Sequence, residues 1–225
     1  MSSSLKETDI LYEDNHIIIV NKKASEIVQV DESGDEPLLE KVKAFIKIKY
    51  SKEGNVFLGV IHRLDRPVSG AIIFARTSKA LTRLNKMFQE KKIKKTYWAL
   101  TIKTPPKENG HLKHYLVKDR SKNKTKAHAN QVPDSKFSEL KYNVLKKVNE
   151  KALLEVSPLT GRSHQIRVQL STIGYPIKGD LKYGAQDANS DKSICLHSYK
   201  VEFIHPVSQK SIIVVAPIHK PYLWE

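Results

Sequence analysis

A short polar stretch between two apolar runs carries the residues best suited to chemistry: His62, Arg63, Asp65 and Arg66. Mainly apolar residues fill positions 56–61 before it and 71–75 after it, a pattern typical of buried strands. Opposite charge favours the ionised form of a carboxyl group, so the two arginines are expected to keep Asp65 charged. Such a carboxylate can serve as a nucleophile or a base. The alternative is a structural Asp–Arg pair that holds a turn, and the stretch alone leaves both open.

Two residues predict that this stretch is a loop. Pro67 fixes its own φ and disfavours helix in the residue before it, and Gly70 permits backbone conformations that other residues resist. The candidate carboxylate is therefore expected to be presented by a turn between two strands.

A second group of candidate residues, Arg162, His164 and Arg167, occurs late in the chain. Apolar residues at helical spacing predict a helix over about 163–173 that ends at Gly174. The helix dipole disfavours cations in the first turns, so this placement suggests an anionic partner. The alternative is a surface helix whose long side chains extend into water.

The chain is strongly basic, with a net charge of +15 and a pI of about 9.7. This excess favours a polyanionic partner, most simply nucleic acid, although plain solubility or a lysine-rich proteome would also explain it. A very polar segment, 118–126, is expected to be a loop or hairpin arm that contacts phosphates; the alternative is a solvated loop. Its basic residues are Lys118, Arg120, Lys122, Lys124 and Lys126.

The remaining pattern predicts an α+β fold with a mixed, mostly antiparallel sheet, because strands dominate and do not alternate regularly with helices. Helices are expected from Pro37 and from Ser78, which is a suitable N-cap. The expected strands cover about 16–20, 27–30, 56–61, 71–75, 96–103, 111–118, 137–148, 152–156, 194–204 and 212–216. No repeat, linker or composition break divides the chain, so one domain over 1–225 is expected.

The composition also bears on the cellular compartment. The hydrophobic fraction is 40% and the charged fraction 28%, which indicates a globular chain and excludes a disordered one. The single cysteine, Cys195, cannot form an internal disulfide. No signal-peptide core occupies the first ten residues, and no apolar run approaches the ~20 residues of a membrane-spanning helix. We expect a cytoplasmic protein without a membrane partner.

Three separated motifs resemble those of the RluA-type pseudouridine synthases. The first is His62-Arg63-Leu64-Asp65 with Ser69-Gly70 and the following apolar run. The second is the 160–170 segment followed by Gly174-Tyr175-Pro176 and Gly179-Asp180. The third is Lys95-Thr96-Tyr97-Trp98-Ala99, and the opening 11–22 also matches. The resemblance covers about residues 10–217. Val68 departs from a usual Thr and Gln169 from a frequent His.

The resemblance implies the pseudouridine synthase fold and the isomerisation of uridine to pseudouridine in RNA, without metal or organic cofactor. Asp65 would be the nucleophile, Arg167 its partner and Tyr97 the residue that stacks on the target base. Arg63 would fill the space left by the flipped base, and His62 would support the loop or contact phosphate. Substrate contacts are further expected from Arg66, Arg162, His164, Gln165 and the basic segment 118–126.

The implied partner is an rRNA or tRNA stem-loop, bound by a monomer. Because the motifs begin by about residue 10, no room is expected for a preceding S4-type domain. Two other readings stay open: a non-catalytic RNA- or ribosome-binding module on the same fold, and an unrelated nuclease that uses His62 and Asp65.

Overall fold

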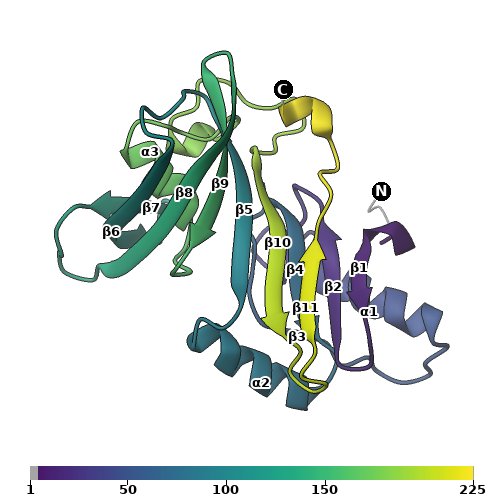
Figure 1. Ribbon diagram of the computed structural model, residues 1–225. Helices are drawn as coiled ribbons and strands as arrows, with labels where there is room; N and C mark the ends of the chain where they lie inside the picture. The colour runs from purple at the N-terminus through teal and green to yellow at the C-terminus, as the bar shows by residue number, and fades with distance from the viewer. Residues whose placement is uncertain (1–4, 225) are drawn as a thin grey trace. The chain divides into compact units, whose positions relative to one another are not determined.

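The computed structural model describes residues 5–224, which divide into two compact units (Figure 1). Unit 1 contains residues 5–94 and 198–219. Unit 2 contains residues 95–197 and 220–224. The expectation of one domain over 1–225 stays a prediction.

Unit 1 is built on a mostly antiparallel sheet with buried central strands. Its strands are β1 (Ile10–Glu13), β2 (Ile17–Lys22), β3 (Gly59–Val60), β4 (Ser69–Ala75), β10 (Leu196–Ile204, in unit 1 from Ser198) and β11 (Ser211–Val215). Their order is β1-β2-β4-β10, with β11 beside β10 and β3 beside β4. Every residue of β2 is buried, so this strand fixes the position of Lys22 at its end.

Helices α1 (Leu38–Lys49) and α2 (Ser78–Gln89), with the short 3-10 helix η1 (Glu7–Asp9), complete unit 1. Ala80 and Leu84 of α2 pack into the main cluster of buried apolar residues. The predicted cap of α2 was wrong by one residue: Ala80 N–H donates to Thr77 Oγ1 at 3.2 Å, so Thr77 rather than Ser78 is the N-cap.

Two predicted strands of unit 1 were wrong or too long. Ile27 and Val28 are buried, but their carbonyls accept the N–H groups of Leu38 and Leu39 at 2.8 and 3.1 Å. They therefore satisfy the first turn of α1 and join no ladder. The expected strand over 56–61 shrinks to Gly59–Val60, since Phe57 is 49% exposed.

Unit 2 is a five-stranded antiparallel sheet with one face covered by α3. Its strands are β5 (Lys94–Thr101), β6 (Asn109–Asp119), β7 (Lys124–His128), β8 (Lys136–Val148) and β9 (Lys151–Pro158). Their order is β5-β9-β8-β6-β7. The helical pieces are α3 (Gln165–Thr172), η2 (Leu181–Tyr183) and η3 (Pro221–Trp224). Leu116 and Ala127 of the sheet pack against Val168 and Tyr183.

The pairings with a defined register in both units are antiparallel, and the α+β prediction is confirmed. The strands expected over 137–148 and 152–156 form a hairpin joined by Asn149 and Glu150, because β8 and β9 pair down to Val148 and Lys151. Among residues 5–224, no helix is both long and apolar enough to cross a membrane.

Candidate active site

The predicted loop that carries Asp65 connects β3 to β4 in unit 1, and Asp65 lies within a tight turn. Val68 N–H donates to the Asp65 carbonyl at 3.0 Å, which closes a turn around Arg66 and Pro67. Leu64 and Val68 are buried at 8% and 2% exposure, so both sides of the turn are anchored in the core. The Asp65 side chain itself is half-buried. The turn therefore holds an acid at a fixed place while leaving it partly accessible.

Gly70 is required where the loop enters β4. Its φ is +109°, and a Cβ built there would lie 2.4 Å from the Ser198 carbonyl oxygen. Only glycine combines this conformation with so close an approach of β10. Close packing of the β4 and β10 backbones thus sets the direction in which the loop joins β4.

Lys22, the last residue of β2, supports the loop from the interior. Its side chain is completely buried, and Nζ donates to the carbonyls of Lys23 at 2.9 Å, Arg66 at 3.2 Å and Val68 at 2.7 Å. An ammonium group has three N–H donors and an uncharged amine has two, so three acceptors favour the charged form. Two of the acceptors belong to the turn that contains Asp65.

Burial acts against that charge and lowers the pKa of Lys22 to about 7. The negative charges of Glu26 and Asp65 raise this pKa, and the positive charge of Arg66 lowers it further. Asp65 is therefore close enough to Lys22 for the two charges to interact. The sequence analysis gave this lysine no role; its position two residues after the apolar run 17–20 was the available signal.

His62 is held within unit 1 by a stacking contact and a backbone hydrogen bond. Its ring stacks on Phe88 of α2, with centroids 5.0 Å apart and planes at 28°. Ile73 N–H of β4 donates to His62 Nε2 at 3.0 Å. Since Nε2 accepts this bond, a neutral His62 carries its proton on Nδ1. These contacts agree with a supporting role for His62 in the loop.

The two arginines beside Asp65 are exposed. Arg66 forms an ion pair with Asp35, another exposed residue of unit 1, and Arg63 also faces solvent. The sequence analysis expected both arginines to act on Asp65. The structure gives Arg66 a different carboxylate partner and adds Lys22 as a cation on the interior side of Asp65.

The segment that leads into α3 is fixed by a glutamine and a left-handed residue. His164 has φ +54°, so the helix begins at Gln165 and not near 163 as predicted. Gln165 Oε1 accepts from Arg162 N–H at 2.9 Å and from Thr160 Oγ1 at 2.8 Å, and its Nε2 donates to the Glu139 carbonyl at 3.0 Å. Arg162 precedes the helix and His164 is its N-cap, so Arg167 alone of the three lies within the first turn.

Arg167 lies inside α3 and is paired with Asp180 in the buried part of unit 2. Nε donates to Asp180 Oδ2 at 2.7 Å and Nη2 donates to Oδ1 at 2.8 Å. The two side chains are 6% and 1% exposed. The guanidinium also lies over the ring of Tyr183, 5.0 Å from its centroid. Sequence reasoning had quoted Asp180 within a motif without giving it a role.

Tyr183 ties three segments of unit 2 together. Its hydroxyl accepts the Thr125 N–H of β7 at 2.8 Å and lies 2.8 Å from His164 Nδ1. Burial raises the pKa of this hydroxyl, so it stays protonated. The network connects the start of α3 to the basic hairpin.

Tyr97 lies in β5 opposite Val156 and is 8% exposed. Trp98 follows Tyr97 in the strand, so it points to the other face, and it is half-buried. The ring of Tyr97 is therefore largely buried.

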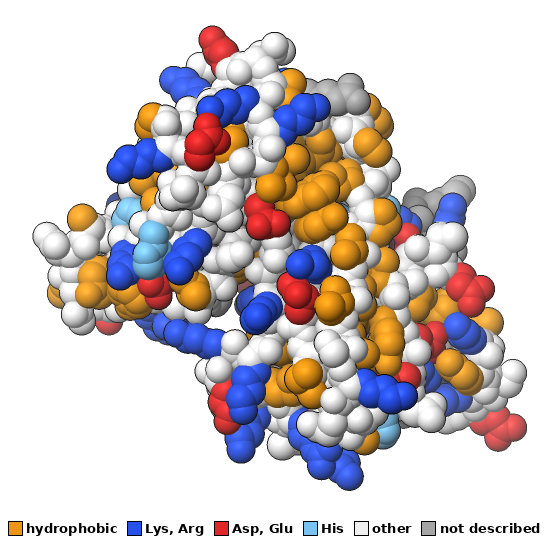
Figure 2. Space-filling view, viewed as in Figure 1, with side chains coloured by type: hydrophobic (Ala, Val, Ile, Leu, Met, Phe, Trp, Pro, Cys, Tyr) orange, Lys and Arg blue, Asp and Glu red, His pale blue; other side chains and the backbone are white. Residues whose placement is uncertain are grey.

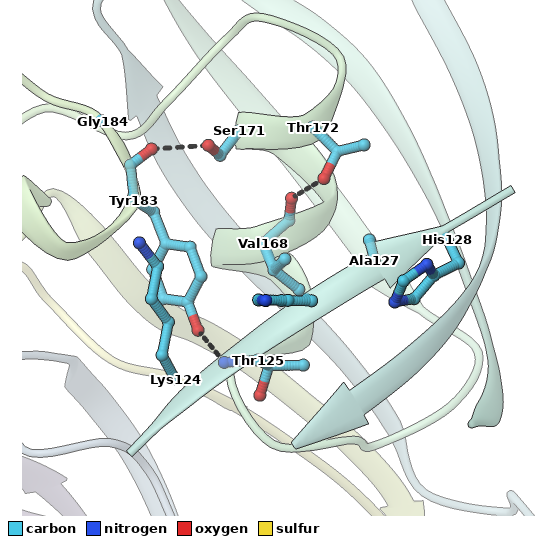
Figure 3. Close-up of a pocket in the computed structure, with 10 residues that line it drawn as sticks. Lys124, Thr125, Ala127, His128, Val168, Ser171, Thr172, Tyr183 and Gly184 are labelled. Atoms are coloured by element: carbon cyan, nitrogen blue, oxygen red, sulfur yellow. Dashed lines mark hydrogen bonds between the residues drawn. The ribbon is translucent and has the colours of Figure 1, made fainter. Parts of the chain in front are cut away.

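The predicted basic segment is a hairpin, formed by the end of β6 and β7. All five of its predicted basic residues are exposed. Lys118 pairs with Thr125 in the ladder, whereas Lys124 and Lys126 pair with Asp119 and Val117. The lysines are thus divided between two faces. An open hollow of about 450 Å³ lies between β7 and α3, lined by Lys124, Lys126, His128 and Tyr183 among others (Figure 3).

Comparison with known proteins identifies the family. A model of the RNA pseudouridylate synthase family matches residues 16–172, which is more than half of the chain and includes Asp65, Tyr97 and Arg167. The chain belongs to this family, as its motifs indicated.

The most similar relatives include two proteins named ribosomal large subunit pseudouridine synthase C. That of Buchnera aphidicola subsp. Acyrthosiphon pisum is 36% identical over 216 residues, covering 93% of this chain and 67% of the relative. That of Buchnera aphidicola subsp. Baizongia pistaciae is 33% identical over 216 residues, covering 93% and 66%. The chain thus spans about two thirds of the length of these curated relatives.

A solved structure confirms the fold. Human RNA pseudouridylate synthase domain containing 4 matches with a TM-score of 0.80 and 20% identity, covering 96% of this chain and 91% of that one. At this level of identity, the likeness concerns the fold alone. The prediction of the pseudouridine synthase fold is confirmed.

Proposed function

We propose that the protein isomerises uridine to pseudouridine at a specific site in structured RNA, either rRNA or tRNA. The observation that carries the proposal is the half-buried Asp65, presented by a turn whose carbonyls are held by the buried Lys22. Membership of the RNA pseudouridylate synthase family supports it. An acid fixed in this way is preorganised for attack on a bound nucleoside.

In this reaction the N1–C1′ bond of uridine breaks and a C5–C1′ bond forms. The proton at C5 is lost and N1 gains one, so the product has the same composition as the substrate. We propose Asp65 as the nucleophile, attacking either C1′ of the ribose or C6 of the uracil. Arg167 would pair with Asp65 and orient it, and Tyr97 would stack on the target base.

The target uridine must leave the RNA stack before it can react. Extrusion costs a few kcal/mol and is least costly where the nucleotide is already unpaired, which favours a loop or stem-loop substrate. Arg63 is exposed and planar at its end, and would occupy the space that the base leaves. Exposed basic residues, including the hairpin 118–126, would hold phosphates.

Substitution of the nucleophile tests this proposal. Asp65→Asn should lower pseudouridine formation by at least about a thousandfold, because a nucleophile that forms a covalent intermediate is lost. RNA affinity should change little, since one amide replaces one acid. Asp35→Asn is a matched control, because Asp35 is an exposed acid in the same unit. Substantial turnover by Asp65→Asn would refute Asp65 as the nucleophile.

The same samples separate the other readings. RNA binding by the wild-type protein without any pseudouridine would favour a non-catalytic RNA-binding module. Shortening of the RNA would favour a nuclease. Unchanged RNA length with altered nucleoside composition is the result expected here. Mapping pseudouridines across all RNAs in cells with and without the protein would identify the target.

A further inference from the structure

Three ring side chains form a row across three neighbouring strands of unit 2. Tyr115 of β6 pairs directly with Phe137 of β8 on one side and with His128 of β7 on the other. Directly paired residues of an antiparallel ladder place their side chains on the same face of the sheet. The rings of Tyr115 and Phe137 lie 5.7 Å apart, edge to face at 65°. We call these three residues the ring row.

The ring row lies on the open face of the sheet. Leu116, Thr125 and Ser138 each lie an odd number of positions from the ring-row residue of their own strand, and they are 3%, 2% and 0% exposed. Leu116 packs toward α3. Because successive side chains alternate between faces, Tyr115 and Phe137 point away from α3. His128, on the edge strand β7, also borders the hollow beside α3. Phe137 is 41% exposed, which is unusual for so large an apolar ring.

Cationic side chains flank the ring row on the same face. Lys126 pairs with Val117 in the next position toward the hairpin, and Lys113 pairs with Glu139 in the next position the other way. Both lysines are exposed. Figure 2 shows hydrophobic, histidine and basic side chains gathered together over β6 and β8.

The acid next to the row, Glu139, is compensated by its neighbours. Glu139 Oε1 lies 2.6 Å from His111 Nε2 and 3.9 Å from Lys113 Nζ. Beside the row, Arg162 Nε donates to the Phe137 carbonyl at 3.2 Å, so this guanidinium stays close to the exposed ring. The face therefore offers aromatic surface bordered by positive charge.

We propose that the ring row is a stacking surface for unpaired bases of the RNA, outside the target uridine. Aromatic side chains that stack on bases, together with cations that track phosphates, are the combination found where proteins bind single-stranded nucleic acid. A base-paired helix hides the faces of its bases, so the row selects an unpaired segment. That this RNA is a substrate rests on the proposed function. That unpaired RNA binds to the ring row does not depend on it.

The test compares the wild-type protein with the double variant Tyr115→Ala/Phe137→Ala. Affinity for a labelled unpaired RNA of about ten nucleotides is measured by fluorescence anisotropy over a range of salt concentrations. The dissociation constant should rise on the order of tenfold or more, because stacking is lost. The slope of affinity against salt should stay the same, because no charge is removed. Affinity for a fully paired RNA should stay within about twofold, since a duplex offers no base face to the row.

Two controls separate stacking from damage to the sheet. Tyr115→Phe and Phe137→Tyr keep an aromatic ring and should retain wild-type affinity. Leu145→Ala removes another exposed apolar side chain, 47% exposed, from the same strand β8, and should also bind normally. A second measurement needs no variant: RNA carrying 4-thiouridine is crosslinked to the wild-type protein, and the adducts should fall on peptides that contain Tyr115 or Phe137.

Unchanged affinity of the double alanine variant, or crosslinks on neither peptide, would overturn the proposal and leave this face to a protein partner. Equal weakening toward unpaired and fully paired RNA would overturn it as well. Binding is measured apart from turnover. Absence of pseudouridine from every sample, wild type included, would therefore refute the proposed function and leave the stacking result standing.

Discussion

The guanidinium of Arg167 and the carboxylate of Asp180 share two parallel hydrogen bonds, 2.7 and 2.8 Å long, where both side chains are almost fully buried. A planar guanidinium matches a carboxylate in this way and becomes fixed in orientation. The pair therefore sets the direction of the residue that we propose to orient Asp65. The carboxylate of Asp180 also compensates the buried positive charge of Arg167.

Substitution of Asp180 by Asn should lower the free energy of unfolding by about 3–5 kcal/mol, because it removes a buried carboxylate that compensates the charge of Arg167. Turnover should fall as well, since Arg167 loses its orientation. Denaturation with urea measures the first effect. Asp191→Asn is the control: Asp191 pairs with Lys220, which is 46% exposed, and should cost about 1 kcal/mol or less. Equal losses in the two variants would contradict the special role of the buried pair.

The free energy of unfolding should depend on pH through Lys22. Burial lowers its pKa to about 7, while an unfolded lysine titrates near ~10.4. Between these values the unfolded chain binds more protons than the folded protein, so stability rises with pH. Below about pH 7 the lysine is charged in both states, and its contribution is constant.

Comparison of the wild-type protein with Lys22→Met isolates this effect. The difference between their free energies of unfolding should grow with pH in that window, by up to about 1.4 kcal/mol per pH unit. Lys47→Met, at an exposed position of α1, should reproduce the wild-type dependence. Parallel curves for the wild type and Lys22→Met would show that Lys22 does not titrate there.

Gly70→Ala should destabilise the protein by at least about 2 kcal/mol, because a new Cβ would meet the Ser198 carbonyl oxygen at 2.4 Å with φ at +109°. The matched control is Gly174→Ala. Gly174 also has a positive φ, +88°, but no atom lies within 4 Å of a Cβ built there. That variant should cost only about 1 kcal/mol. Similar losses in the free energy of unfolding for the two variants would mean that β10 shifts to accommodate the added methyl group.

Lys124→Gln/Lys126→Gln should weaken RNA binding and flatten its dependence on salt. Each phosphate contact that is lost should reduce the slope of log affinity against log salt by about 0.7 for single-stranded RNA. Filter binding at several salt concentrations gives the slope. Lys43→Gln/Lys47→Gln on α1 removes the same charge from unit 1 and serves as the control. An unchanged slope in the hairpin variant would count against phosphate contact there.

The elements predicted best are those that bury a continuous apolar run. The runs at 17–20 and 71–75 are strands, and the stripe of Leu38, Val42 and Ile46 is the buried face of α1. Ile27 and Val28 show the limit of this reasoning. They are as apolar as a strand, but their carbonyls are used by a helix that begins about ten residues later.

The site was predicted where it depends on local sequence and missed where it depends on distant partners. The turn at Asp65 followed from Pro67 and Gly70. The burial of Lys22 did not, because its acceptors in the turn lie 44 and 46 residues away and lysine is rarely buried. The pairing of Arg167 with Asp180 likewise depends on how the loop after α3 folds back.

The hydrogen bond that Thr125 N–H donates to the Tyr183 hydroxyl has a consequence for the behaviour of the protein in concentrated solution. β7 is the last strand of its sheet, and an outermost strand can recruit a strand from another molecule. The tyrosine occupies one of the outward amides through which such recruitment would begin, and Lys124 and Lys126 on either side add repulsion between like chains. The bond and the two lysines thereby oppose self-association along this edge of unit 2.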